Sequence, residues 1–200
     1  MTIELWRVAS DTPGWTADDM SGKGAASHGA RWNHAGELVT YAATSIALAA
    51  WETRAHFGRG AALPWNRFLV RIDIPDDIWA ARQMLHRPPP VGWDAIPEGM
   101  VSRNEGSAWL RSARTALLAV PSVIIHEEDN VLLNPAHADR ARIVATKVRR
   151  FVYDPRVGAV RSSAQGRASL NASTRWLHAH QSRPNDVMSG SRSAAPNPVA

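Results

Sequence analysis

The sequence predicts an α+β fold, formed by a single domain over residues 1–154. Short segments that alternate apolar and polar residues, as strands do, outnumber segments with helical length and period. The two helical segments do not alternate regularly with the strands, as a doubly wound parallel sheet would require. The length of 200 residues suits one domain with a real core and is short for two.

The first half of the domain contains three predicted strands and one predicted helix. We expect strands at residues 3–9, 37–42 and 67–74, the last of them ended by Pro75. Ser45 is a suitable N-cap for a helix that runs to about Phe57, where Gly58 and Gly60 supply the stop.

The second half contains one more predicted helix and three more strands. Residues 104–118 have helical spacing, and Val120-Pro121 ends that helix. We expect strands at residues 120–125, 131–133 and 143–153, and a surface loop at residues 88–90, which are three prolines.

The remaining residues, 155–200, have the composition of a disordered basic extension. Ser, Ala, Arg, Asn, Pro and Gly dominate this segment, which has few large apolar residues to offset the entropy of ordering. The segment holds six arginines against one acid, Asp186, whereas residues 1–154 hold 17 basic and 17 acidic residues. The net charge of +5 therefore belongs to the extension, and the domain itself is neutral.

Composition also limits the chemistry and the location. The chain has no cysteine, so any reaction must use oxygen and nitrogen groups. Its eight histidines form no HExxH motif, and we expect no metal site. No apolar run approaches the roughly 18–20 residues of a membrane span, and the N-terminus has no secretory pattern. We therefore expect a cytoplasmic protein that does not enter a membrane.

Glu52 is the first candidate catalytic residue, because it follows an entirely apolar run at residues 46–51 in the predicted first helix. Such a helix is expected to be buried around most of its circumference, which would place this carboxylate against apolar surface or in a cleft. The alternative is a surface ion pair with His56, four residues further on.

Four other residues have both a functional and a structural interpretation. Arg31 follows a glycine-rich loop and could grip phosphates, or could be a solvated loop residue. Arg7 could bind a phosphate, or it could be a charged residue at the edge of a sheet. Tyr41 could stack on a planar ligand or pack in the core. Ser122 lies in no GxSxG motif, so a hydrogen-bonding role is favoured over that of a nucleophile.

Taken together, these segments resemble the RES domain, a family of bacterial toxins, over most of residues 3–152. The pieces that carry the resemblance share the order and spacing of the family and are Leu5-Trp6-Arg7, Gly29-Ala30-Arg31-Trp32-Asn33, Gly36, Tyr41-Ala42-Ala43-Thr44-Ser45, Trp51-Glu52, His56, Val120-Pro121-Ser122, Asn130, Leu133-Asn134-Pro135 and His137. The family's usual Gly-Arg-Trp is Ala30-Arg31-Trp32 here, which matters only if the first position needs a positive φ.

The resemblance implies an ADP-ribosyltransferase-like fold, with a split β core, flanking helices and a cleft for NAD. It implies that Glu52, Arg31 and Tyr41 form the catalytic centre, and that Arg7, Ser122 and Asn130 line the cleft together with Arg31 and Tyr41. Cleavage between ribose and nicotinamide builds positive charge on the sugar, which a fixed carboxylate stabilises.

The function expected from this resemblance is that of a toxin which degrades NAD by hydrolysis or phosphorolysis and arrests growth. NAD is then a substrate, inorganic phosphate is a potential co-substrate, and no other cofactor is expected. The expected partner is a helix-turn-helix antitoxin, through which nucleic acid is contacted only indirectly. A mono-ADP-ribosyltransferase acting on a protein is the alternative, and a nucleic-acid-binding module that uses the basic extension is a remoter one.

Overall fold

A seven-stranded mixed sheet forms the centre of the computed structural model, which describes residues 1–57 and 63–157. The strand order is β4-β5-β6-β2-β1-β3-β7, and every neighbouring pair is antiparallel except β4 and β5. The strands are β1 (Thr2–Ser10), β2 (Thr40–Ala43), β3 (Arg67–Pro75), β4 (Gln83–Met84), β5 (Leu117–Pro121), β6 (Asp129–Leu133) and β7 (Val144–Arg150).

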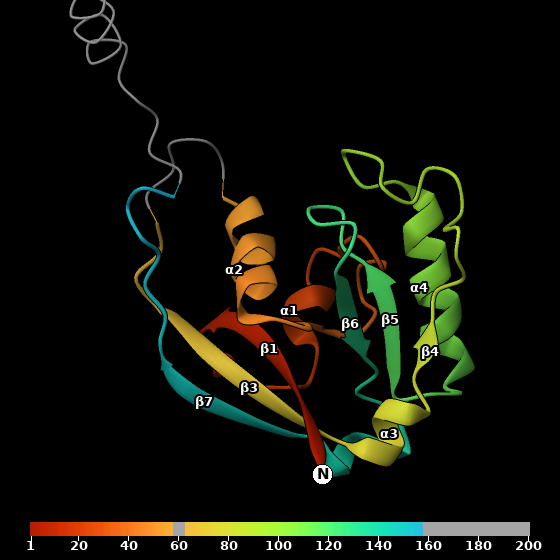
Figure 1. Ribbon diagram of the computed structural model, residues 1–200, viewed down its shortest axis with the longest axis horizontal. Helices are drawn as coiled ribbons and strands as arrows, with labels where there is room; N and C mark the ends of the chain where they lie inside the picture. Colours follow the sequence, from red (N-terminus) through yellow and green to blue (C-terminus); the bar gives the residue numbers. More distant parts are fainter. Residues whose placement is uncertain (58–62, 158–200) are drawn as a thin grey trace, which may run out of the picture. The chain divides into compact units, whose positions relative to one another are not determined.

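The sheet is nearly divided in two between β1 and β2. These strands are in register at one pair only, Trp6 with Ala43, whereas β1 and β3 pair along their whole length. The half made of β1, β3 and β7 therefore diverges from the half made of β2, β6, β5 and β4 (Figure 1). This arrangement confirms the predicted α+β fold with a split β core.

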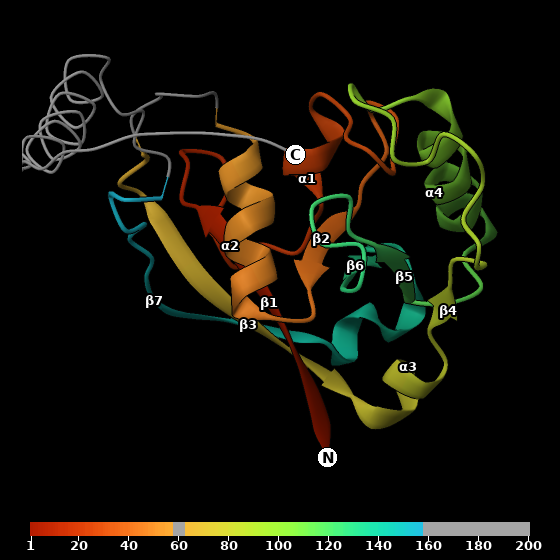
Figure 2. The same cartoon turned by 45° about the horizontal axis from the view of Figure 1, so that its top comes forward.

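The two longer helices cover one face of the sheet, on either side of this split. They are α2 (Ile46–Ala55) and α4 (Met100–Ser112), and the shorter helices are α1 (Lys23–Ala26), α3 (Asp76–Ala80) and the 3-10 helix η1 (Ala138–Arg142). Helix α2 packs on Val8, Ala43 and Leu69, while α4 packs through Trp109 near Leu118 and Leu132. The loop between β5 and β6 lies between α2 and α4 (Figure 2).

The opposite face of the sheet carries the largest apolar cluster. Its strand residues include Leu5, Val70, Ile72 and Leu117, all of them buried, and Met20 from a loop packs against them. Because side chains alternate across a strand, this face is separate from the one that carries Tyr41 and Ala43.

Several predicted elements are confirmed with small shifts, whereas the second helix and the strand predicted at residues 120–125, which is β5 at 117–121, were wrong in part. Ser45 caps α2 as predicted, since its Oγ accepts a hydrogen bond from Leu48 N at 3.1 Å. The second predicted helix extended too far: α4 ends at Ser112, where Ala113 adopts φ 46°, and the apolar residues after it form β5. A continuous apolar run fits a buried strand as well as a buried helix, which explains the error.

Helix α2 is less buried than its apolar run predicted. Only Leu48 and Ala49 are buried, whereas Ile46 and Trp51 are exposed. The helix contacts the sheet along one side, and its other side faces away from the described residues. Gly58, Gly60 and most of the C-terminal extension lie outside the described residues, so the domain boundary near residue 154 remains a prediction. Among the described residues, no helix is both long and apolar enough to span a membrane.

Candidate active site

Glu52 is held in place by two hydrogen bonds to one of its carboxylate oxygens. Ser122 Oγ donates to Glu52 Oε1 at 2.7 Å, and Asn130 Nδ2 donates to the same oxygen at 2.5 Å. The three residues come from α2, from the end of β5 and from β6, so the fold joins segments that are 70 or more residues apart. Three of the predicted site residues are therefore in direct contact.

The other oxygen of this carboxylate, Oε2, has no hydrogen-bond partner within residues 1–57 and 63–157. The expected alternative, an ion pair between Glu52 and His56, is absent from the same residues, and His56 is exposed. A carboxylate fixed through one oxygen and open at the other is suited to face a developing positive charge.

Ser122 is a positioning residue in this arrangement. It is fully buried, and its Oγ also accepts hydrogen bonds from Ile124 N at 3.0 Å and Ile125 N at 3.1 Å. With its proton directed to Glu52 and its lone pairs used by two backbone amides, this hydroxyl is fully engaged. The geometry agrees with the predicted hydrogen-bonding role of Ser122.

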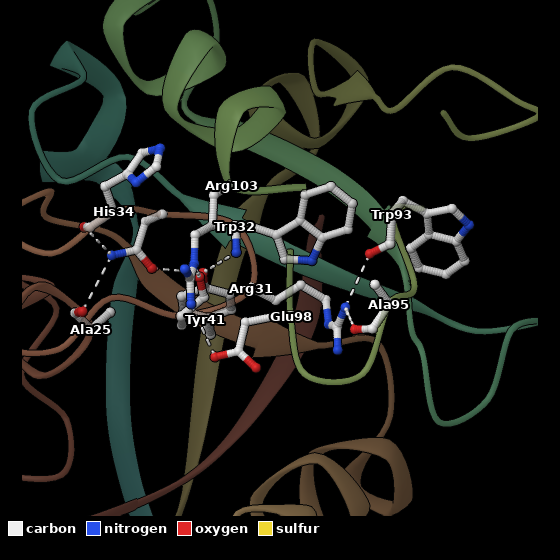
Figure 3. Close-up of polar contacts among 11 residues, drawn as sticks. Ala25, Arg31, Trp32, His34, Tyr41, Trp93, Ala95, Glu98 and Arg103 are labelled. Carbon is white, nitrogen blue, oxygen red and sulfur yellow. Dashed lines mark hydrogen bonds and ion pairs between the residues drawn. The ribbon is translucent and has the colours of Figure 1, made fainter. Parts of the chain in front are cut away.

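Arg31 is anchored by one nitrogen only. Its Nη1 donates to the carbonyl oxygens of Trp93 and Ala95, each at 3.0 Å (Figure 3). In the part of the chain that the structure describes, Nε and Nη2 have no hydrogen-bond partner, and no carboxylate lies within 4 Å of the guanidinium. The side chain is thus oriented but keeps donors for an anionic ligand.

Tyr41 holds the segment that carries Arg31. Its hydroxyl donates to Asn33 Oδ1 at 2.9 Å and accepts from Trp32 N at 3.1 Å. Burial raises the pKa of the Tyr41 phenol well above its ordinary value, so the group stays protonated at neutral pH. The hydroxyl therefore acts as a hydrogen-bonding group that holds the Arg31 segment beside the site.

Arg103 and Glu98 form an ion pair next to Tyr41 that the sequence did not predict. Arg103 Nη2 donates to Glu98 Oε1 at 3.3 Å, and Arg103 Nε donates to the carbonyl oxygen of Ala30 at 3.3 Å. Figure 3 shows this pair beside the Tyr41 ring, with Arg31 extending past it. The pKa of the Glu98 carboxyl is lowered by a backbone hydrogen bond and by the nearby Arg103 and Arg31.

Arg7 is not brought together with the other predicted residues. It lies on the face of β1 that carries Leu5 and Ala9, opposite to Trp6 and Val8. Its Nη1 donates to the carbonyl oxygen of Asp19 at 2.9 Å. Burial lowers the pKa of this guanidinium, an effect that Asp19 opposes.

Asn33 and Gly106 help to hold the segment that carries Arg31 in place. Asn33 is fully buried and its Nδ2 donates to three carbonyl oxygens, those of Ala25, His34 and Glu37. Gly106 of α4 packs so closely that a Cβ there would overlap the carbonyl oxygen of Trp32. The departure from Gly-Arg-Trp is harmless, because the positive φ of 73° falls on Gly29 and not on Ala30.

The loop between β5 and β6 links the Glu52 side of the site to the Arg31 side. At its two ends, Ser122 contacts Glu52 and Glu128 Oε2 accepts a hydrogen bond from Ser45 Oγ at 2.8 Å. At its tip, the His126 ring lies 5.5 Å from the ring of Trp93, whose carbonyl anchors Arg31. A pocket of about 280 Å³ elsewhere, between β4, β5 and α4, contains none of the predicted site residues.

Comparison with known proteins identifies the family. The RES domain family model matches residues 4–154. A Sphingobium protein named Prs ADP-ribosylating toxin is 51% identical over 158 residues, which cover 78% of this chain and 98% of that protein. A protein of Yersinia enterocolitica named Toxin Res is 33% identical over 72% of this chain and 93% of its own length.

Solved structures support the fold. The MbcT–MbcA toxin–antitoxin complex of M. tuberculosis contains a chain that matches with a TM-score of 0.53 and 16% identity, over 74% of this chain and 85% of that one. At this identity the likeness concerns the fold alone. The family model, the relatives and the split sheet agree, and the chain belongs to the RES domain family.

Proposed function

We propose that this protein is the toxin of a toxin–antitoxin pair and that it breaks the bond between nicotinamide and ribose in NAD. The observation that carries the proposal is the Glu52 carboxylate, which Ser122 and Asn130 fix through Oε1 while Oε2 has no hydrogen-bond partner among the described residues. As the C1′–N bond breaks, its electron pair leaves with neutral nicotinamide and positive charge develops on the ribose. A preoriented carboxylate stabilises that charge without having to reorganise.

The acceptor of the ADP-ribosyl group defines two forms of this activity. The 51% identical relative is named as an ADP-ribosylating toxin, which favours transfer to a protein side chain. In that form, a lone pair of the acceptor bonds to C1′ and the acceptor proton passes to solvent. Hydrolysis or phosphorolysis, which uses water or phosphate as the acceptor, is the second form and depletes NAD directly.

Product analysis separates the two forms. NAD labelled in its adenylate half is incubated with the protein, alone, with phosphate, and with candidate protein acceptors. The protein named Prs, which the name of the Sphingobium relative specifies, is the first acceptor to test. Label on protein supports transfer, whereas free ADP-ribose or its phosphate supports degradation. If folded protein leaves NAD intact under all three conditions, the proposal is wrong.

The proposed partner is a helix-turn-helix antitoxin that blocks the NAD site. An unrestrained enzyme of this kind harms its own cell, and the related fold of MbcT is known in a complex with an antitoxin. Expression of this chain alone should arrest growth, and co-expression of the antitoxin should restore it. Normal growth at high levels of folded, unmodified protein would contradict the toxin function.

A further inference from the structure

Two arginines from different segments lie close to a single carboxylate beside Tyr41. Arg31 comes from the loop before β2, Arg103 comes from α4, and Glu98 precedes that helix. Both arginines are close enough to lower the pKa of Glu98. Among the described residues, Arg31 has no carboxylate within 4 Å and Arg103 has only Glu98. The cluster therefore carries one more positive than negative charge.

The start of α4, which carries Arg103, has no side chain that competes for this guanidinium apart from Glu98. Gly99, its N-cap, provides no side-chain cap, and the first turn contains no acidic residue. Ser102, in the same turn, is fully buried and its Oγ has no hydrogen-bond partner in the structure. Ser102 lies on the side of α4 that carries Gly106, which packs against Trp32. Of the residues in this turn, Arg103 is the one that contacts the Arg31 segment, through the carbonyl oxygen of Ala30.

We propose that Arg31 and Arg103 form the cradle for the diphosphate of NAD, and that Glu98 occupies this cradle as an internal counter-ion until the diphosphate displaces it. This inference rests on the proposed function, because it names the part of the substrate that this side of the site binds. A diphosphate presents more charge and more acceptor oxygens than one carboxylate. It can therefore accept hydrogen bonds from the guanidinium donors of Arg31 and Arg103 that Glu98 does not use.

Arg103 takes the role that the family resemblance implied for Arg7. Arg7 lies on the other face of the sheet and is bound to the Asp19 carbonyl. Arg103 is on the same side as Arg31 and Tyr41, and the bond from its Nε to Ala30 fixes it against the Arg31 segment. Displacing Glu98 frees Nη2 without breaking that anchor, which keeps the guanidinium in place for a ligand.

The ion pair between Glu98 and Arg103 is weak enough for a diphosphate to replace Glu98. Its side chain is 40% exposed, that of Arg103 is 28% exposed, and a single hydrogen bond of 3.3 Å joins them. Glu98 lies in the loop before α4 and not within the helix, so its side chain can turn away while the helix stays on the sheet.

Direct binding measurements test this cradle without turnover. Inorganic pyrophosphate is titrated into three variants, Glu98→Gln, Arg103→Gln and Arg103→Lys. NAD is titrated into the same three variants, each combined with Glu52→Gln so that NAD is not consumed. Arg103→Gln should weaken both ligands by roughly tenfold or more, the scale of one lost hydrogen bond to a charged group. Arg103→Lys should recover part of that loss. Glu98→Gln should tighten both ligands, because it removes the competing charge.

Arg142→Gln is the matched control. Arg142 also pairs with carboxylates, those of Asp77 in α3 and Asp139 in η1, and neither element contributes a residue to the Glu98–Arg103 cluster. It should leave both affinities unchanged. Equal pyrophosphate binding by the Arg103→Gln and Arg142→Gln proteins would overturn the cradle, as would weaker binding after Glu98→Gln. If pyrophosphate binding follows the prediction while the parental protein never consumes NAD, the cradle stands and the proposed function fails.

Discussion

At the scale of single residues, the geometry around Glu52 depends on the hydroxyl of Ser122. This hydroxyl orients the carboxylate and also satisfies two backbone amides of the loop that follows β5. We expect Ser122→Ala to lower kcat roughly ten- to hundredfold, because one hydrogen bond to a charged group is lost. NAD affinity should change less than kcat. Unchanged kcat in a folded Ser122→Ala protein would show that Glu52 does not need this support.

The residues of the Glu52 cluster could be predicted from the sequence, but the Glu98–Arg103 pair could not. Glu52, Ser122 and Asn130 stand in recognisable family segments, and the structure brings them into contact. Arg103 and Glu98 look like ordinary charges at the start of a helix, which are usually solvated. Their importance arises from the contact of Arg103 with Ala30, 73 residues away, and spacing along the chain does not reveal such a contact.

At the scale of elements, the position of α4 depends on Gly106. A side chain there would overlap the Trp32 carbonyl, so Gly106→Ala should push α4 away from the segment that carries Arg31. We expect the free energy of unfolding to fall by about 1–3 kcal/mol, the usual cost of overpacking. Gly24→Ala in α1 is the control, since a Cβ there meets only Trp15 at 4.0 Å. Denaturant unfolding of the two variants checks this, and equal stability would contradict the close packing.

The elements themselves could be predicted where a local signal exists. The Ser45 cap and the alternation in β3 located α2 and β3 well. The end of α4 was missed because it depends on Ala113 adopting a left-handed conformation, which its residue type does not predict. The two residues of β4 form a strand only because β5 lies beside them, a tertiary effect that local sequence cannot indicate.

At the scale of the whole molecule, an ion pair joins the end of β1 to the edge strand β7. Lys147 Nζ donates to both carboxylate oxygens of Asp11, at 2.8 and 2.9 Å, and Ala17 N donates to Oδ1 at 2.7 Å. These bonds, chiefly that of Lys147, lower the pKa of Asp11 in the folded protein. The Asp11 contribution to stability is therefore fully present above the unfolded pKa of about 3.9 and is lost as the pH falls through the lower folded value.

We accordingly expect Asp11→Asn to reduce the free energy of unfolding at neutral pH and to make it less sensitive to acid. The difference between parent and variant should shrink steadily below about pH 4, where the parental carboxyl becomes protonated. Denaturant unfolding at a series of pH values measures this difference. A constant difference across the series would show that the Asp11–Lys147 pair does not control acid stability.

We propose that the Glu52 carboxylate stabilises the positive charge that develops on the ribose when NAD is cleaved. Glu52→Gln keeps the shape of the side chain but removes the negative charge of the carboxylate, whereas Arg31→Ala removes a proposed donor to the diphosphate of NAD. The most direct measurement is therefore kcat for NAD consumption by folded Glu52→Gln protein, with NAD affinity determined alongside for both variants. We predict that Glu52→Gln lowers kcat at least roughly a hundredfold and leaves affinity nearly intact, while Arg31→Ala weakens affinity. NAD consumption by Glu52→Gln at the parental rate would contradict the account.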